Sequence, residues 1–204
     1  MKYSIFLWIL AVVLGVTTGL LNWSFWVPIG IISVLAVFNL VYTLYIMYKS
    51  QNLGTIEKLI RKNKRNPVYG YALELKEGTK EDVIKKLELI MKRYKQPLIK
   101  HSYGFNHAML LKEYEIAKNH AKQIESHPIG QYCLALVAAF EGDEEKALNR
   151  SFKYEWMREG VAAAYYYAKH DLDAYRLYRD KAISASYGIQ HFSNVHFFKQ
   201  LEQN

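Results

Sequence analysis

Charged side chains are almost absent from the first 48 residues of this 204-residue chain. Between Ser4 and Tyr48 there is no Asp, Glu, Lys, Arg or His, and only Asn22-Trp23-Ser24 separates two apolar runs. An apolar helix of roughly 17–25 residues crosses the hydrocarbon core of a bilayer, where it satisfies its own backbone hydrogen bonds. The sequence therefore predicts a membrane anchor over residues 1–48 that contains two transmembrane helices, at about residues 4–21 and 25–48.

Cysteine is scarce as well, and familiar catalytic motifs are missing. The single cysteine, Cys133, excludes an intramolecular disulfide framework, and its apolar neighbours favour a buried side chain. The seven histidines include no pair at the i,i+4 spacing that places two metal ligands on one helix face. There is also no glycine-rich phosphate loop and no Gly-x-Ser-x-Gly sequence. We therefore expect no enzyme activity, no cofactor and no metal site.

The basic residues predict how the anchor is oriented. Lys2 precedes the first apolar run, the turn between the runs carries no charge, and a basic cluster follows the second run. This cluster consists of Lys49, Lys58, Arg61, Lys62, Lys64 and Arg65. Because basic residues flanking a span stay on the cytoplasmic side, we expect a multi-pass protein of the cell (plasma) membrane with both termini in the cytoplasm. The Lys-rich composition and the single cysteine suggest a bacterial membrane.

Residues 49–67 are predicted to form a basic juxtamembrane amphipathic helix or linker. Leu53, Ile56, Leu59 and Ile60 recur at helical spacing. The six basic residues named above are candidates for contact with anionic headgroups of the inner leaflet. The alternative is that they only fix the topology and solvate a linker. Charges are nearly balanced from residue 66 onward, which argues against a nucleic-acid-binding domain.

Small and polar residues inside the apolar runs allow helices to contact each other, either within one chain or between two chains. Gly15-x-x-x-Gly19 permits close approach of helices, and Gly30, Ser33 and Ala36 form a second stripe of small side chains. The stripes either pack the two spans on each other or, through Gly15 and Gly19, join two copies of the chain. Asn39 is strongly polar for its depth in a span, and it either bonds a neighbouring helix or has a functional role.

The rest of the chain predicts helices only. From Val68 onward apolar residues recur with a period of 3.6, and no convincing strand pattern occurs. Four stretches share a small or aromatic helix, a polar turn and an acidic start to a second helix, and equivalent positions return at intervals of roughly 30 residues. Thr79 and Asp82 have the spacing of a capping box. Asp143 and Asp171 are candidate N-caps of later second helices.

The segment Gly142-Asp143-Glu144-Glu145-Lys146-Ala147 resembles the turn and second-helix start of tetratricopeptide-type repeats. That resemblance implies a cytoplasmic, α-solenoid-like stack of helical hairpins over residues 68–185. Each hairpin in such a stack leaves an apolar face that only a neighbour can cover. We therefore expect residues 186–204 to form a capping helix. Its covering side chains would be Ile189, Phe192, Val195 and Phe198.

A cluster of tyrosines and arginines is the candidate binding surface. It comprises Tyr165, Tyr166, Tyr175, Tyr178, Arg158, Arg176 and Arg179. Tyrosine is favoured at interfaces and arginine can hold a carboxylate, so this cluster would line a groove for a peptide. The alternative is that the tyrosines pack in the core with their hydroxyls at its rim.

These observations favour a membrane-anchored cytoplasmic scaffold or adaptor that binds a protein or peptide through its helical repeats. Two alternatives remain open. One is an accessory or regulatory subunit of a membrane enzyme or transport complex, and the other is an envelope or lipid enzyme whose site is unrecognised.

Overall fold

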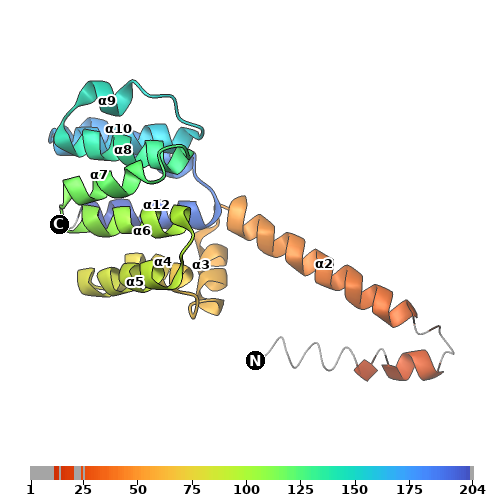
Figure 1. Ribbon diagram of the computed structural model, residues 1–204. Coiled ribbons are helices and arrows are strands. Elements are labelled where there is room, and N and C mark those ends of the chain that lie inside the picture. Colours follow the sequence, from red (N-terminus) through yellow and green to blue (C-terminus); the bar gives the residue numbers. More distant parts are fainter. Residues whose placement is uncertain (1–11, 14, 21–23, 25, 203–204) are drawn as a thin grey trace. The chain divides into compact units, whose positions relative to one another are not determined.

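In a computed structural model, every regular element of the described residues is a helix (Figure 1). The described residues are 12–13, 15–20, 24 and 26–202. This confirms the all-α prediction. The chain divides into two compact units, Met1–Tyr45 and Ile46–Asn204, which we describe in turn.

The first unit contains most of α2 (Trp26–Tyr48), whose last turn belongs to the second unit. Among the described residues, α2 is the one helix long and apolar enough to cross a membrane. Its large apolar side chains are mostly exposed. The predicted span at residues 4–21 and the turn after it lie largely outside the described residues, although 12–13 and 15–20 are helical.

The glycines of the small-residue stripes have open space beside them among the described residues. A Cβ atom built at Gly15, Gly19 or Gly30 would have no described neighbour within 4 Å. Both predicted uses of these stripes, packing within a hairpin and dimerisation, therefore stay predictions.

After the last turn of α2, the second unit continues with α3 (Leu53–Lys62) and four pairs of consecutive helices. The pairs are α4 (Pro67–Glu77) with α5 (Lys80–Arg93), α6 (Pro97–Leu110) with α7 (Tyr114–Lys122), α8 (Pro128–Glu141) with α9 (Glu144–Leu148), and α10 (Glu155–Ala168) with α11 (Leu172–Ser184). Pro67, Pro97 and Pro128 each occupy the first turn of a helix, where the missing N–H has no intrahelical partner to lose.

In three of the pairs the second helix begins with an N-cap side chain, at the residues that the sequence predicts. Thr79 and Asp82 form a complete capping box at the start of α5. Asp143 accepts a hydrogen bond from the backbone N–H of Lys146 at α9, and Asp171 accepts one from Ala174 at α11. These bonds satisfy donors that the first turn of a helix leaves unpaired.

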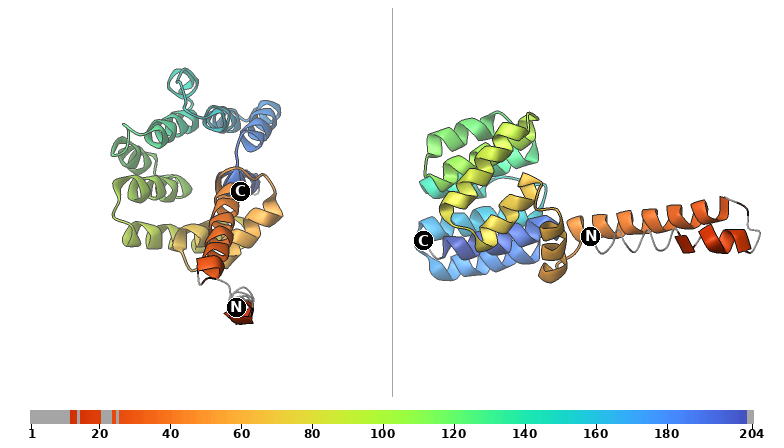
Figure 2. Two further views of the ribbon diagram at one scale, coloured as in Figure 1. Left: turned by 90° about the vertical axis from the view of Figure 1, so that its right-hand side faces the viewer. Right: turned by 90° about the horizontal axis from the view of Figure 1, so that it is seen from below.

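The last helix, α12 (Gly188–Leu201), closes the second unit into a ring. It packs on α11 and also on α3 and α4, so the end of the described chain meets the beginning of this unit (Figure 2). Phe198 packs with Tyr175 and Ala163, and the role of α12 as the cap of a repeat stack stays a prediction. The contact of α12 with α3 and α4 was not predicted, and Phe192, which has no exposed surface, lies there against Ile56.

Burial of α3 in the ring decides how this helix can meet a membrane. Ile56 and Ile60, on its apolar face, have no exposed surface and pack with Leu73 and Phe192. This face is therefore not free to enter lipid, and any headgroup contact has to come from the basic side chains on the other faces.

A close backbone contact, which we call the closure joint, holds the ring shut. It joins Met47–Gln51 to Ser184–Gly188. The backbone N–H of Gly188 donates to Ser50 O at 2.7 Å, and Gln51 Nε2 donates to the carbonyls of Ser184 and Ser186. Gly188 has a φ of 60°, and a Cβ atom there would lie 1.8 Å from Met47 O. Only glycine fits this position.

Candidate functional site

Three consecutive tyrosines of α10 point in different directions. Tyr165 is buried, and its hydroxyl donates to Glu144 Oε2 of α9 at 2.9 Å. Tyr166 stacks on Tyr178 of α11, with ring centroids 5.2 Å apart and planes at 6°. Tyr167 reaches α12, where its hydroxyl donates to Leu201 O at 3.0 Å. The helical twist thus divides the tyrosines between a surface and the core.

Tyr175 belongs to the core side of this division. Its ring is 1% exposed, and its hydroxyl lies 3.4 Å from Phe198 O. Burial raises the pKa of this hydroxyl above its usual value, which keeps it neutral. Tyr165 and Tyr175 therefore stabilise the packing of α9 and α12, and they offer no open face to a partner.

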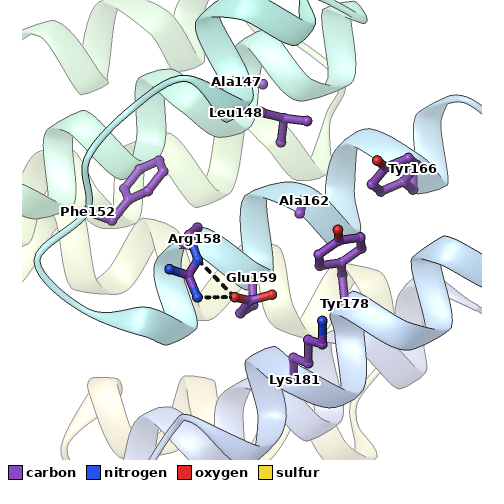
Figure 3. Close-up of a pocket in the computed structure, with 9 residues that line it drawn as sticks. All are labelled: Ala147, Leu148, Phe152, Arg158, Glu159, Ala162, Tyr166, Tyr178 and Lys181. Atoms are coloured by element: carbon purple, nitrogen blue, oxygen red, sulfur yellow. Dashed lines mark hydrogen bonds and ion pairs between the residues drawn. The ribbon is translucent and has the colours of Figure 1, made fainter.

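A hollow of about 330 Å³ opens beside the stacked pair Tyr166–Tyr178. We call it the α9–α11 hollow (Figure 3). It is lined by Ala147, Leu148, Phe152, Arg158, Glu159, Ala162, Tyr166, Tyr178 and Lys181. Its walls come from α9, α10, α11 and the loop that links α9 to α10. The sequence-predicted residues that it brings together are Arg158, Tyr166 and Tyr178.

Glu159 is the one carboxylate among the described residues that line the α9–α11 hollow, and it is 5% exposed. Arg158 donates to a single oxygen, Oε1, through Nε at 2.9 Å and Nη2 at 2.6 Å. No described residue donates a hydrogen bond to Oε2. Figure 3 shows this second oxygen directed toward the side where Tyr178 and Lys181 lie.

The three predicted arginines are all engaged by carboxylates of their own unit. Arg158 pairs with Glu159, whose hydrogen bonds raise the pKa of the guanidinium above its usual value. Arg179 pairs with Asp180 and Glu202. Arg176 lies outside the α9–α11 hollow, and its Nη1 is 3.6 Å from the Asp173 carboxylate.

A second hollow, of about 450 Å³, adjoins the first. It is lined by Arg150, Ser151, Phe152, Tyr154, Glu155 and Arg158. Phe152 and Arg158 line both hollows, which therefore adjoin each other, and we call the two together the depression. Its lining combines aromatic rings with side chains of both charges.

Sequence reasoning missed Glu159, Phe152 and Lys181. The signal for Glu159 was present, because it directly precedes Gly160-Val161-Ala162-Ala163-Ala164, a run that is buried throughout. A carboxylate beside such a run is costly to bury without a partner. Phe152 lies in a loop with no periodicity, so nothing in the sequence placed it beside α11.

The candidate lipid-contact residues surround α3 and its ends. Arg61 is held by two carboxylates, with Nη2 2.8 Å from Glu57 and 2.6 Å from Glu77. Its hydrogen bond lowers the pKa of the Glu77 carboxyl. The other five side chains are exposed: Lys49, Lys58, Lys62, Lys64 and Arg65.

Two histidines that are distant in the sequence meet between α6 and α7. The Nδ1 atoms of His101 and His120 lie 3.0 Å apart, so one ring donates and the other accepts. Burial lowers the pKa of both rings. The His120 ring packs on Gly104, where a Cβ atom would lie 2.5 Å from it. The pair is a structural contact between neighbouring helices.

No family model, curated protein or solved structure matches this chain. The geometry of the second unit is therefore the basis for a functional proposal.

Proposed function

We propose that this chain is a membrane-anchored scaffold or adaptor that binds a protein or peptide partner. In this proposal α2 and the preceding apolar run form a two-span anchor in the cell membrane. The unit Ile46–Asn204 lies in the cytoplasm and acts as a tetratricopeptide-like interaction module.

The α9–α11 hollow is the observation that carries this proposal. Phe152, Tyr166 and Tyr178 give it aromatic faces, which supply contact area at low cost in conformational entropy. Arg158 and Glu159 add hydrogen-bonding groups that can fix the orientation of a bound chain. The described lining residues include no histidine or cysteine and only one carboxylate, so they offer recognition groups rather than a proton-transfer pair.

Site-specific photo-crosslinking in intact cells tests the proposal. A photoreactive phenylalanine analogue at Phe152, inside the depression, is expected to form an adduct with one discrete protein. The matched control places the same analogue at Leu89 of α5, which is 46% exposed and outside both hollows. Equal adduct patterns at the two positions, or none at Phe152, would contradict the proposal.

A role as an accessory subunit of a membrane complex is the second candidate, and Asn39 favours it. The Asn39 side chain is exposed on an apolar helix, and no described residue bonds its amide. A polar group in a span gains most by bonding another helix, either in a partner or in a second copy joined through Gly15 and Gly19. If so, Asn39→Leu should abolish co-purification of that protein in mild detergent while Phe152 adducts persist.

We also propose that the exposed basic residues near α3 contact anionic headgroups. Each lysine or arginine near such a surface contributes about 1 kcal/mol of attraction. Lys58 and Lys64 are exposed and close in sequence to the predicted span, which supports this assignment.

A further inference from the structure

We infer that the α9–α11 hollow takes a basic side chain, lysine or arginine, of the partner peptide, with Glu159 as its acceptor. This inference rests on the proposed peptide-binding function and specifies the chemistry of the ligand.

Oε2 of Glu159 is an acceptor that solvent reaches and to which no described residue donates a hydrogen bond. Glu159 is 5% exposed, and Arg158 binds only its Oε1 atom. A buried carboxylate is costly unless its lone pairs are satisfied. A donor entering the hollow would satisfy Oε2, and a cationic donor would do so with a charge-assisted bond.

The walls of the hollow suit a cation as well. Tyr166 and Tyr178 are stacked 5.2 Å apart, and aromatic faces attract cations electrostatically. The molecule already contains one such contact, because Lys181 Nζ lies 4.9 Å from the centroid of the Tyr178 ring. Lys181 is exposed and can swing away, so a ligand ammonium or guanidinium could take its place over the ring.

Charge and hydrogen bonding disfavour an apolar or an acidic side chain in the hollow. An apolar side chain in the hollow would displace solvent from Oε2 of Glu159 and leave this oxygen without a donor. An acidic side chain would meet the Glu159 carboxylate, and like charges at short range repel each other. The rim residues Arg158 and Lys181 repel a cation only through solvent, because the Arg158 side chain is 61% exposed and Lys181 is exposed.

Selection from a random octapeptide display library, with the full chain in lipid nanodiscs as bait, tests this inference. Wild-type protein should enrich peptides that share Lys or Arg at one position. Glu159→Gln removes the charge and should weaken binding of the selected peptides about tenfold or more. Lys181→Ala removes the competing cation and should strengthen it. A merely structural role of these residues would not move the two affinities in opposite directions.

Glu145→Gln is the matched control, because it removes one carboxylate of α9 that is exposed and does not line the hollow. It should leave binding unchanged. Thermal unfolding of each variant reports whether the fold survives, and Lys181→Ala carries the test if Glu159→Gln unfolds. Enriched peptides without a shared basic position would overturn the inference and leave peptide binding intact. No enrichment over empty nanodiscs would overturn the proposed function itself.

Discussion

At the scale of single residues, Gly188 is a position that leaves no room for a side chain. Its φ is positive and its Cα faces the carbonyl of Met47. Gly188→Ala adds left-handed strain of about 1–2 kcal/mol and a clash that forces the backbones apart. We expect the melting temperature of the second unit to fall by roughly 5–10 °C, measured by circular dichroism of the full chain in detergent.

Gly142→Ala is the control for that substitution. Gly142 also has a positive φ, 79°, but a Cβ atom there would meet only the flexible end of Lys169, at 3.2 Å. This variant carries the strain without the backbone clash, and we expect a fall of roughly 2–5 °C. Equal effects of the two substitutions would show that the closure joint contributes nothing beyond local strain.

His101 and His120 predict how stability depends on pH. Burial lowers both pKa values below 6.5, so the unfolded chain binds more protons than the folded protein just below that pH. Stability is therefore full above about pH 6.5 and falls as the pH drops toward the folded pKa values, by at most about 1.4 kcal/mol per pH unit for each proton. Urea unfolding at pH 7.5 and 5.5 measures this loss.

The variant His101→Gln should reduce this pH dependence, because it removes one of the two half-buried rings. His196 of α12, whose pKa is also lowered by burial, contributes in the same direction and should leave a residual slope. A slope unchanged in His101→Gln would assign the whole effect to other groups.

At the scale of elements, α12 has two packing partners, and Phe192 secures the second of them. This ring is fully buried with Ile56 and Ile60. Phe192→Ala should cost about 3–5 kcal/mol, while Phe197→Ala, whose ring is 42% exposed, should cost less than about 1 kcal/mol. Chemical denaturation of both variants checks this, and similar losses would contradict the packing of α12 on α3.

The elements also show what the sequence can and cannot predict. Helices, their caps at Thr79 and Asp143, and the proline starts follow from local chemistry, so they could be predicted. Ring closure could not, because it depends on Gly188 meeting Met47 across more than half the chain. The α9–α11 hollow was predicted only in part. Arg158, Tyr166 and Tyr178 were identified because tyrosine and arginine are frequent in this segment. The position of each residue around its helix, which composition does not give, directs Tyr175 into the core and Glu159 into the hollow.

At the scale of the whole molecule, the predicted topology can be tested by cysteine labelling in intact cells. An impermeant maleimide should label Ser24→Cys from outside and leave Lys64→Cys unlabelled until the cells are opened. Cys133 should stay silent in both, because it is 3% exposed and burial raises the pKa of its thiol above the usual range. Labelling of Lys64→Cys from outside would show that the second unit lies outside the cell, which contradicts the predicted orientation.

Closure by α12 also has a consequence for synthesis. This helix leaves the ribosome after all the other described helices. The apolar face of α3 that packs against α12 therefore stays uncovered until then. At 5–20 residues per second, the interval between α3 and α12 is on the order of ten seconds. Throughout that time the nascent chain presents Ile56 and Ile60 to chaperones and proteases. A frameshift near Gly188 would make that state permanent, and the truncated product would be recognised as unfinished although most of its helices are intact.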